Sequence, residues 1–299
     1  MDKIFSIKEN LKESIPLMSL LSAVNLIMMI LITYLPITGV VVVFLLPLPS
    51  IICTLFIKSR YYVIYALTSL IISIIFCIGD FTSVLFTLIP VLISSFVYAF
   101  LIKCNLGVLN SLVLTSFILT FINLLELFIF NYFFNINFIE IICNLLNIQN
   151  IEYLNNSIPT FVYLYSLVQG LMMLITTYDQ VKKFYIEDFY YKTCSIVQIS
   201  FLSVTILLTV ILYFFNLSYF YLFLLVSGVS SLFFYTTKRI DRWKILLFTI
   251  FVVITWIIYV LFIKLFPMER SFILLLVLPI LILAYKSIDL ACKIKQKKV

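Results

Sequence analysis

The sequence predicts an all-α protein that crosses a membrane several times, and three observations lead to this fold class. Of its 299 residues, 64% are hydrophobic and only 11% are charged, and the mean hydropathy is +1.22. A soluble domain of this length cannot hide so much apolar surface in one core. Apolar runs of about 20 residues, the length of a membrane-crossing helix, recur along the chain. Lysine and arginine gather in alternate connections between these runs.

Ten runs are long and apolar enough to cross a bilayer as helices. The second and third are separated only by Lys-Ser-Arg and the third and fourth by Gly-Asp, which leaves room for tight helical hairpins. The predicted spans are residues 15–36, 37–57, 60–79, 81–103, 106–130, 158–178, 195–214, 218–236, 245–263 and 270–290.

The distribution of basic residues predicts the orientation of these helices. With the N-terminus in the cytoplasm, all but two of the 20 Lys and Arg residues fall on inner segments, and the two exceptions are Lys264 and Arg270. Cytoplasmic loops carry the Lys/Arg excess in membrane proteins. Because adding or removing one helix breaks this pattern, we expect a polytopic bundle of about ten helices with both termini in the cytoplasm.

The chain is expected to form two membrane units. Residues 1–180 would be a six-helix unit, and residues 181–299 a four-helix unit that ends in the basic tail Lys-Ile-Lys-Gln-Lys-Lys-Val. The charged and aromatic segment 179–194 would join them on the inner side.

The sequence contains little that could support catalysis. It has no histidine, which removes the usual zinc ligand and the usual acid–base catalyst at neutral pH. It also lacks a Gly-rich phosphate loop, a Gly-x-Ser-x-Gly motif, a His-Glu-x-x-His motif and a Cys-x-x-Cys pair. We therefore predict no enzyme activity, catalytic residue, metal site or cofactor. The net charge of +7 is explained by membrane orientation and requires no nucleic-acid partner.

Pro47 and Pro49 interrupt the second run at its centre. Proline has no N–H and clashes with the carbonyl four residues earlier, so the pair would free the carbonyls of Val43 and Leu45. Inside lipid such groups need partners. The candidates for these partners are a neighbouring helix, water, Ser50 and Thr54.

Other unusual residues fall at the same depth as the two prolines. Asn25 lies in the middle of the first run, and Gln169 and Gly170 lie in the middle of the sixth. Broken helices at the membrane midplane provide ligand sites in transporters. One interpretation is thus a ligand-binding site of Asn25, Pro47, Pro49, Gln169 and Gly170 between helices 1, 2 and 6. In the other, Asn and Gln join helices and Pro bends them.

Glu126 is the only acidic residue well inside a predicted span, and it follows Asn123 by three residues on the same helix face. Ionisable groups within membranes mark proton and ion sites. Asn123 and Glu126 are therefore a candidate proton or cation site. Alternatively, Glu126 lies close enough to the outer end of its helix to reach the headgroup region.

Two groups of inner basic residues are candidates for docking a partner protein. They are Lys182 and Lys183 in the segment after the sixth span, and Lys238 and Arg239 after the eighth. The alternative is that these residues only orient the helices and lie in solvent.

The stretch 15–104 resembles the YybS-like family of uncharacterised bacterial membrane proteins. The resemblance is carried by YLPITGVVVVFLLPLPSIICTLFIKSRYYVIYALTSLIISII at 34–75, and VQGL at 168–171 is similar to a later Gln-Gly-Leu of the family. The family is similar in fold to the substrate-binding S subunits of energy-coupling-factor transporters. The resemblance thus implies a bacterial plasma membrane, an outward-opening small-molecule pocket in the first six helices and an ATPase-containing transporter complex. Family genes often neighbour a membrane phosphodiesterase for cyclic di-AMP, which implies a regulatory role.

Together these observations predict a transport-related, non-catalytic membrane protein that binds a small or amphipathic solute at a midplane site. Because no nucleotide-binding motif is present, energy would come from a partner or an ion gradient. The alternative is a scaffold or regulatory subunit for a membrane signalling enzyme such as a cyclic di-AMP phosphodiesterase.

Overall fold

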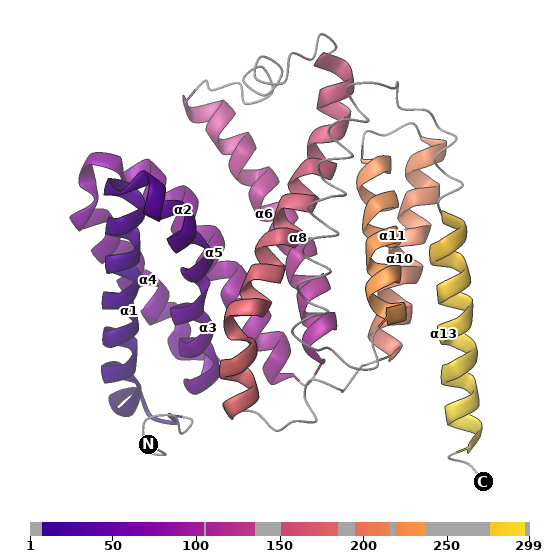
Figure 1. Cartoon of the computed structure of the whole chain (residues 1–299), viewed down its shortest axis with the longest axis horizontal. Coiled ribbons are helices and arrows are strands. Elements are labelled where there is room, and N and C mark those ends of the chain that lie inside the picture. Colours follow the sequence, from indigo (N-terminus) through magenta and orange to yellow (C-terminus); the bar gives the residue numbers. More distant parts are fainter. Residues whose placement is uncertain are drawn as a thin grey trace. The chain divides into compact units, whose positions relative to one another are not determined.

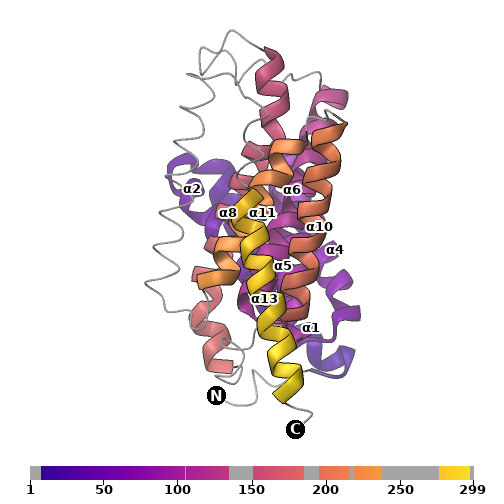
Figure 2. The same ribbon diagram turned by 90° about the vertical axis from the view of Figure 1, so that its right-hand side faces the viewer.

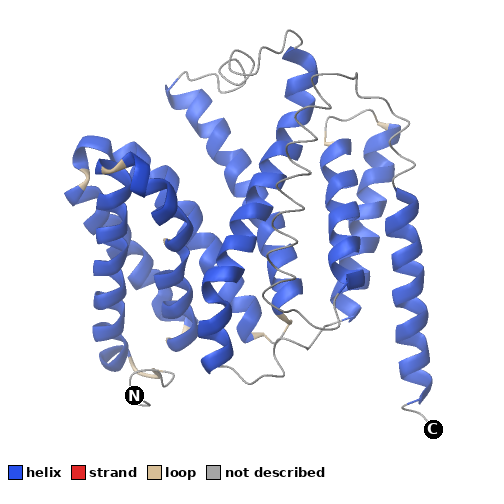
Figure 3. Cartoon of the chain, in the orientation of Figure 1, coloured by secondary structure: helices blue, strands red, loops and turns tan. Residues whose placement is uncertain are grey.

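The computed structural model describes residues 8–104, 106–134, 151–184, 195–215, 219–236 and 276–296, and these residues are almost entirely helical (Figure 3). The only β-type pairing in these ranges is a single bridge between Lys8 and Ile57. The described helices are α1 (Leu11–Tyr34), α2 (Pro36–Leu45), α3 (Pro47–Phe56), α4 (Ser59–Phe76), the 3₁₀ turn η1 (Ile78–Asp80), α5 (Phe81–Lys103), α6 (Val108–Phe134), α8 (Ile151–Phe184), α10 (Ser195–Phe214), α11 (Phe220–Thr236) and α13 (Val277–Gln296). The predicted all-α fold is confirmed for this part of the chain.

The chain divides into two compact units. Unit 1 comprises residues 1–119 with 169–190, and unit 2 comprises residues 120–168 with 191–299. Both α6 and α8 contribute one part to each unit. The predicted boundary cuts the chain once, at residue 180, with six helices before it and four after it. Each observed unit instead combines two separate segments, and the predicted boundary stays a prediction.

Unit 1 is built on α1 to α5, whose contacts follow directly from the sequence. Leu35 leaves the helical region (φ −127°, ψ 80°) because the residue before a proline avoids it, and Pro36 then opens α2 at its first position. α2 folds back on α1, α1 packs on α4, and α3 packs on α5 (Figure 1). Asp80 caps α5 by accepting a hydrogen bond from the backbone N–H of Ser83 at 3.3 Å.

The buried and exposed faces of unit 1 have the polarity expected in lipid. The buried face of α1 includes Ser22 and Asn25, and that of α4 includes Ser69 and Ser73. The exposed face of the same helices carries large apolar side chains: Leu20, Ile27, Val63, Ile64, Leu67, Ile71 and Ile75. Helices in membranes associate through small and polar residues while apolar side chains face the lipid. The pattern is that of membrane-embedded helices.

Unit 2 contains a three-helix cluster of α10, α11 and α13, each of which contacts the other two (Figure 2). Phe220, Leu224 and Leu276 form its buried apolar centre, and Tyr213 packs against them. The rings of Tyr213 and Phe220 are 5.6 Å apart, a distance at which aromatic pairs stabilise each other.

The predicted spans agree with the described helices in position, although several ends differ. Within the described residues, six helices are long and apolar enough to cross a membrane, and shorter apolar stretches occupy Val41–Phe56, Phe220–Phe234 and Pro279–Ile288. Residues 245–263 lie outside the described residues, so the total of ten spans stays a prediction. α8 continues past the predicted span 158–178 to Phe184, so the backbone at the start of the predicted inner segment 179–194 is helical.

Three segments that were predicted to lie on the inner side meet at one end of unit 1. The backbone N–H of Lys8 donates to the carbonyl of Phe56 at 2.8 Å, and the Lys103 amine donates to the carbonyl of Ile57 at 2.6 Å. The last carbonyls of α3 thus find partners from the N-terminal segment and from the end of α5. Which side of the membrane this end faces stays a prediction.

Gly39 allows the close approach of α2 to α1. A Cβ atom at this position would lie 3.0 Å from both Cα and the carbonyl oxygen of Ile32, and backbone atoms cannot rotate away. We expect Gly39→Ala to lower the free energy of unfolding by about 2 kcal/mol, measured in mixed detergent micelles. Gly228→Ala is the matched control, because a Cβ there meets nothing within 4 Å. Equal loss in both variants would contradict the packing argument.

Candidate functional site

The candidate site begins at the break between α2 and α3. Leu46 still has helical angles (φ −55°, ψ −32°), and Pro47 follows as the first residue of α3 with Pro49 two positions later. Neither proline has an N–H for the carbonyl four residues earlier, so Val43 and Leu45 lose their helical partners. The predicted break is confirmed. Its cause is local, since each proline removes one backbone donor.

Ser50 and Thr54 do not take over these carbonyls, which corrects one predicted role. Thr54 donates its hydroxyl to the Ser50 carbonyl at 2.9 Å, within α3 itself. The Ser50 hydroxyl pairs with the Tyr65 hydroxyl at 3.2 Å. Their sequence position made both side chains candidates, but the Thr54 hydroxyl binds a carbonyl within α3 and the Ser50 hydroxyl binds Tyr65 of α4.

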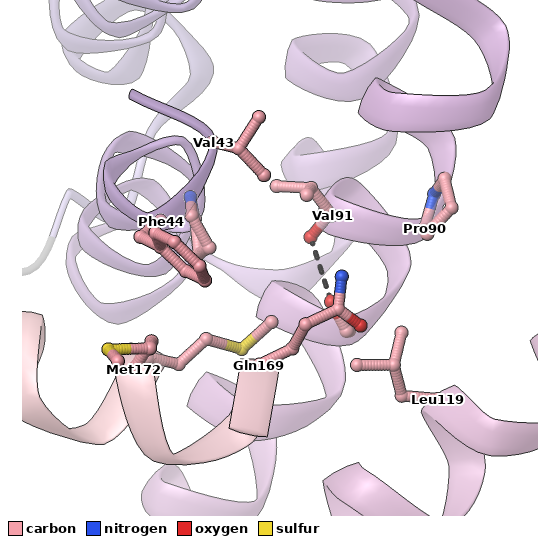
Figure 4. A pocket seen from close by; sticks show the side chains of 10 residues that line it. Val43, Phe44, Pro90, Val91, Leu119, Gln169 and Met172 are labelled. Atoms are coloured by element: carbon pink, nitrogen blue, oxygen red, sulfur yellow. Dashed lines mark hydrogen bonds between the residues drawn. The ribbon is translucent and has the colours of Figure 1, made fainter. Parts of the chain in front are cut away.

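A cavity lies beside the break, within unit 1 (Figure 4). It contains about 320 Å³ of space free of protein atoms, part of which is open to the surroundings. The enclosed part has room for about one ordered water. The lining residues come from α2, α3, α5, α6 and α8: Val43, Phe44, Pro47, Pro90, Val91, Ser94, Leu119, Gln169, Met172 and Met173.

The lining residues lie at mid-depth of their helices. Pro90 and Val91 are central in the span Ile78–Lys103, and Gln169 is central in the span Ile158–Thr177. Pro47 lies next to the centre of the broken pair α2–α3. By residue count, the cavity therefore lies near the middle of these helices, and its depth in the membrane stays a prediction.

Two polar side chains reach the cavity. The amide of Gln169 extends from α8 towards the turn of α5 that carries Val91 (Figure 4). On that turn the Ser94 hydroxyl donates to the Val91 carbonyl at 3.2 Å, which leaves its oxygen lone pairs as acceptors. Met172 and Phe44 belong to the apolar part of the lining. The cavity thus offers hydrogen-bond donors and acceptors within apolar walls.

The structure brings Pro47 and Gln169 together on this cavity, whereas Asn25 belongs to a different cluster. The Asn25 amide nitrogen donates to the Tyr65 hydroxyl at 2.6 Å, so that α1, α4 and α3 are joined through Asn25, Tyr65 and Ser50. Asn25 is completely buried, and its side-chain oxygen has no hydrogen-bond partner among the described residues. Pro49 is buried in α3 and does not line the cavity.

Gly170 lies next to Gln169 and faces α6. A Cβ at this position would overlap the Ser116 hydroxyl and would lie 3.4 Å from a methyl of Leu112. The glycine therefore permits close packing of α8 on α6, which places the neighbouring Gln169. Gly170 serves the cavity through packing and does not line it.

Asn123 and Glu126 both lie against one turn of α8. The Asn123 amide donates to the Ser166 hydroxyl at 2.9 Å, and Glu126 interacts electrostatically with the adjacent Tyr165. Asn123 is buried and Glu126 is partly exposed. The two residues share a helix face as predicted from their spacing. Their role as a proton or cation site stays a prediction.

The predicted docking residues are outside the part of the chain whose side chains are described. The backbone of Lys182 and Lys183 forms the last turn of α8, but their side chains are not described. Lys238 and Arg239 lie outside the described residues altogether. Their role also stays a prediction.

Several residues of the cavity were not predicted. Phe44, Ser94, Met172 and Met173 line it, but serines and methionines occur in many of the spans. Pro90 lies near the centre of its span but was not part of the predicted site. Mid-depth position was the one available signal, since it groups Pro47, Pro90 and Gln169.

Within the described ranges, no group of three or more Cys, Asp and Glu side chains is arranged to hold a metal ion. Cys53 and Cys77 are buried free thiols, and Cys104 is an exposed one.

Residues 23–149 match the sequence model of a family described as "Predicted membrane protein (DUF2232)". The match covers less than half of the chain and includes the second half of α1 and all of α2 to α6, whereas Gln169 and the two cavity methionines lie beyond it. The comparisons with curated proteins and with solved structures gave no match. With its apolar helices, the chain is a multi-helix membrane protein similar to this family over residues 23–149.

Proposed function

We propose that this chain is a transport-related, non-catalytic protein of a bacterial plasma membrane that binds a small or amphipathic solute at the cavity beside the α2–α3 break. Ten helices with both termini in the cytoplasm complete the proposed topology. The proposed site differs from the one expected from sequence, because α5 and α6 contribute to its walls and α1 does not.

The observation that supports this proposal most strongly is the coincidence of three features at one depth. A helix break with two prolines, a cavity and the Gln169 amide lie together near the middle of their helices. Discontinuous helices at the midplane provide binding groups in secondary transporters, because freed backbone groups become available to a ligand. A proline that merely bends a helix does not require a cavity beside it.

The resemblance to YybS-like proteins, and through them to S subunits, supports a recognition role. Energy for movement of the solute would then come from an ATPase-containing partner or from an ion gradient, in which Asn123 and Glu126 are candidate coupling residues.

The experiment compares the small molecules that remain bound to the purified protein. Native mass spectrometry of wild type in mild detergent is expected to show a stoichiometric bound molecule, and Gln169→Leu is expected to lose it. Gln198→Leu is the matched control, since Gln198 is fully buried in α10 and does not line the cavity. A wild type without any bound molecule, or equal retention by both variants, would contradict the proposed site.

A second candidate function is a scaffold or regulatory subunit that docks a membrane signalling enzyme, such as a cyclic di-AMP phosphodiesterase. It is supported by the length of α8, which continues past the span Ile158–Thr177 to Phe184 and carries Lys182 and Lys183 on its last turn. Affinity purification should then recover the enzyme with wild type and lose it with Lys182→Glu/Lys183→Glu. Recovery with the double variant would contradict docking through these lysines.

A further inference from the structure

The chemistry of the cavity walls restricts what can bind there. None of the ten described lining residues is charged, and eight of them are apolar. Their polar groups are the Gln169 amide, which has both donors and an acceptor, and the Ser94 hydroxyl, whose own hydrogen is donated to Val91. These walls can satisfy one hydrogen-bonding group of a ligand, but they contain no counter-charge for an ion.

An ionic ligand would be strongly disfavoured at this position. Moving a charge out of water into an apolar region costs several kcal/mol unless an opposite charge or several hydrogen bonds compensate. The cavity lies at mid-depth, where water is scarce, and none of its described lining residues carries a charge. Phosphates, carboxylates and ammonium groups therefore find no opposite charge here.

The apolar walls favour a compact ligand with an unsaturated or aromatic body. Phe44 lines the cavity with two methionines, Met172 and Met173, each of which brings a thioether. Methionine side chains are flexible and make favourable contacts with ring edges, so they can move to accommodate a ligand larger than the enclosed space. The enclosed space holds only about one ordered water, so a ligand of this kind can enter only where these side chains move.

We propose that the occupant of this cavity is an uncharged, mainly apolar small molecule with one hydrogen-bonding group, which Gln169 and Ser94 bind. This inference rests on the proposed function and narrows it to a class of solute. It excludes nucleotides, phosphorylated metabolites and free amino acids as ligands of this cavity, because all of them carry charge.

The test uses three fluorinated probes that share one ring system. 5-Fluoroindole is neutral with a single N–H donor, 5-fluoroindole-3-acetate adds an anion, and 5-fluorotryptamine adds a cation. Binding to the full chain in lipid nanodiscs is measured by ¹⁹F NMR line broadening, and empty nanodiscs correct for partition into lipid. We expect 5-fluoroindole to bind at least about tenfold more tightly than either charged probe.

Two variants locate the binding. Gln169→Leu should weaken the binding of 5-fluoroindole by about three- to tenfold, because one hydrogen bond is lost. Ser94→Leu should abolish binding by filling the cavity. Gln198→Leu and Ile93→Leu are the controls, because Gln198 lies elsewhere and Ile93 is 43% exposed beside Ser94 without lining the cavity.

The wild-type comparison decides the inference even if a variant fails to fold. Equal or tighter binding of a charged probe, or no binding of 5-fluoroindole above the empty nanodiscs, would overturn the inferred class. The proposed function is judged separately by the molecule retained in native mass spectrometry: a retained charged metabolite that Gln169→Leu loses would support a site here and still overturn the class.

Discussion

Replacing Tyr65 by phenylalanine is expected to lower the free energy of unfolding by about 2 kcal/mol. The Tyr65 hydroxyl is the partner of the Asn25 amide at 2.6 Å and of the Ser50 hydroxyl at 3.2 Å, and all three residues are completely buried. Hydrogen bonds between membrane helices average only about 0.6 kcal/mol. The larger loss is expected because Tyr65→Phe leaves the whole Asn25 amide without a partner.

A double-mutant cycle with Asn25→Leu tests this explanation. In the Tyr65→Phe background the Asn25 amide has already lost its partner. Asn25→Leu should therefore lower the free energy of unfolding less than it does in wild type, by at least about 0.5 kcal/mol. Unfolding in mixed micelles provides the measurement, and Tyr34→Phe is the matched control because Tyr34 is 59% exposed. Additive losses would contradict the network. So would an Asn25→Leu variant of unchanged stability that loses its bound molecule, since Asn25 would then bind the ligand.

Gly170→Leu is expected to be the most damaging change in α8, with a loss of about 3 kcal/mol. A side chain here must enter the space occupied by Ser116 and Leu112 of α6, and it would displace the adjacent Gln169 from the cavity. Gly228→Leu is the matched control, since its surroundings are open. Both stability and the retained molecule should be lost in the first variant only.

A suppressor distinguishes packing from ligand contact at Gly170. Gly170→Ala clashes mainly with the Ser116 hydroxyl, so Ser116→Ala should restore stability and the bound molecule to that variant. Failure of Ser116→Ala to restore either property would contradict the packing role.

The helix break was predictable because its cause is contained in two adjacent turns. Pro47 and Pro49 remove backbone donors whatever surrounds them, and Pro36 moves Leu35 out of the helical region by a contact between neighbours. The depth of Gln169 was predictable for a similar reason, since depth depends on the count of residues along a span.

The partners of mid-depth side chains were not predictable from depth. Asn25 and Gln169 both lie near the middle of their spans, yet Asn25 bonds Tyr65 in one cluster and Gln169 lines the cavity. The direction of a side chain depends on how each helix is rotated about its axis. Long apolar stretches with serines on several faces contain little periodic signal for that rotation.

The end of α8 shows a second limit. Hydropathy marks the residues that lie in lipid, and the span Ile158–Thr177 agrees closely with the predicted run 158–178. The helix itself continues to Phe184 through polar residues, because a helix in water keeps its backbone hydrogen bonds as well as one in lipid. Lys182 was therefore assigned to the segment after the span, and its backbone belongs to the end of the same helix.

The central claim is that a solute occupies the cavity beside the α2–α3 break. It is tested most directly by an experimental structure of the wild-type protein in nanodiscs, purified with the molecule that it retains. We expect density for one non-protein molecule that contacts Pro47, Ser94 and Gln169. A cavity filled by the side chains of Met172 and Met173, with the retained molecule bound elsewhere on the chain, would contradict the claim.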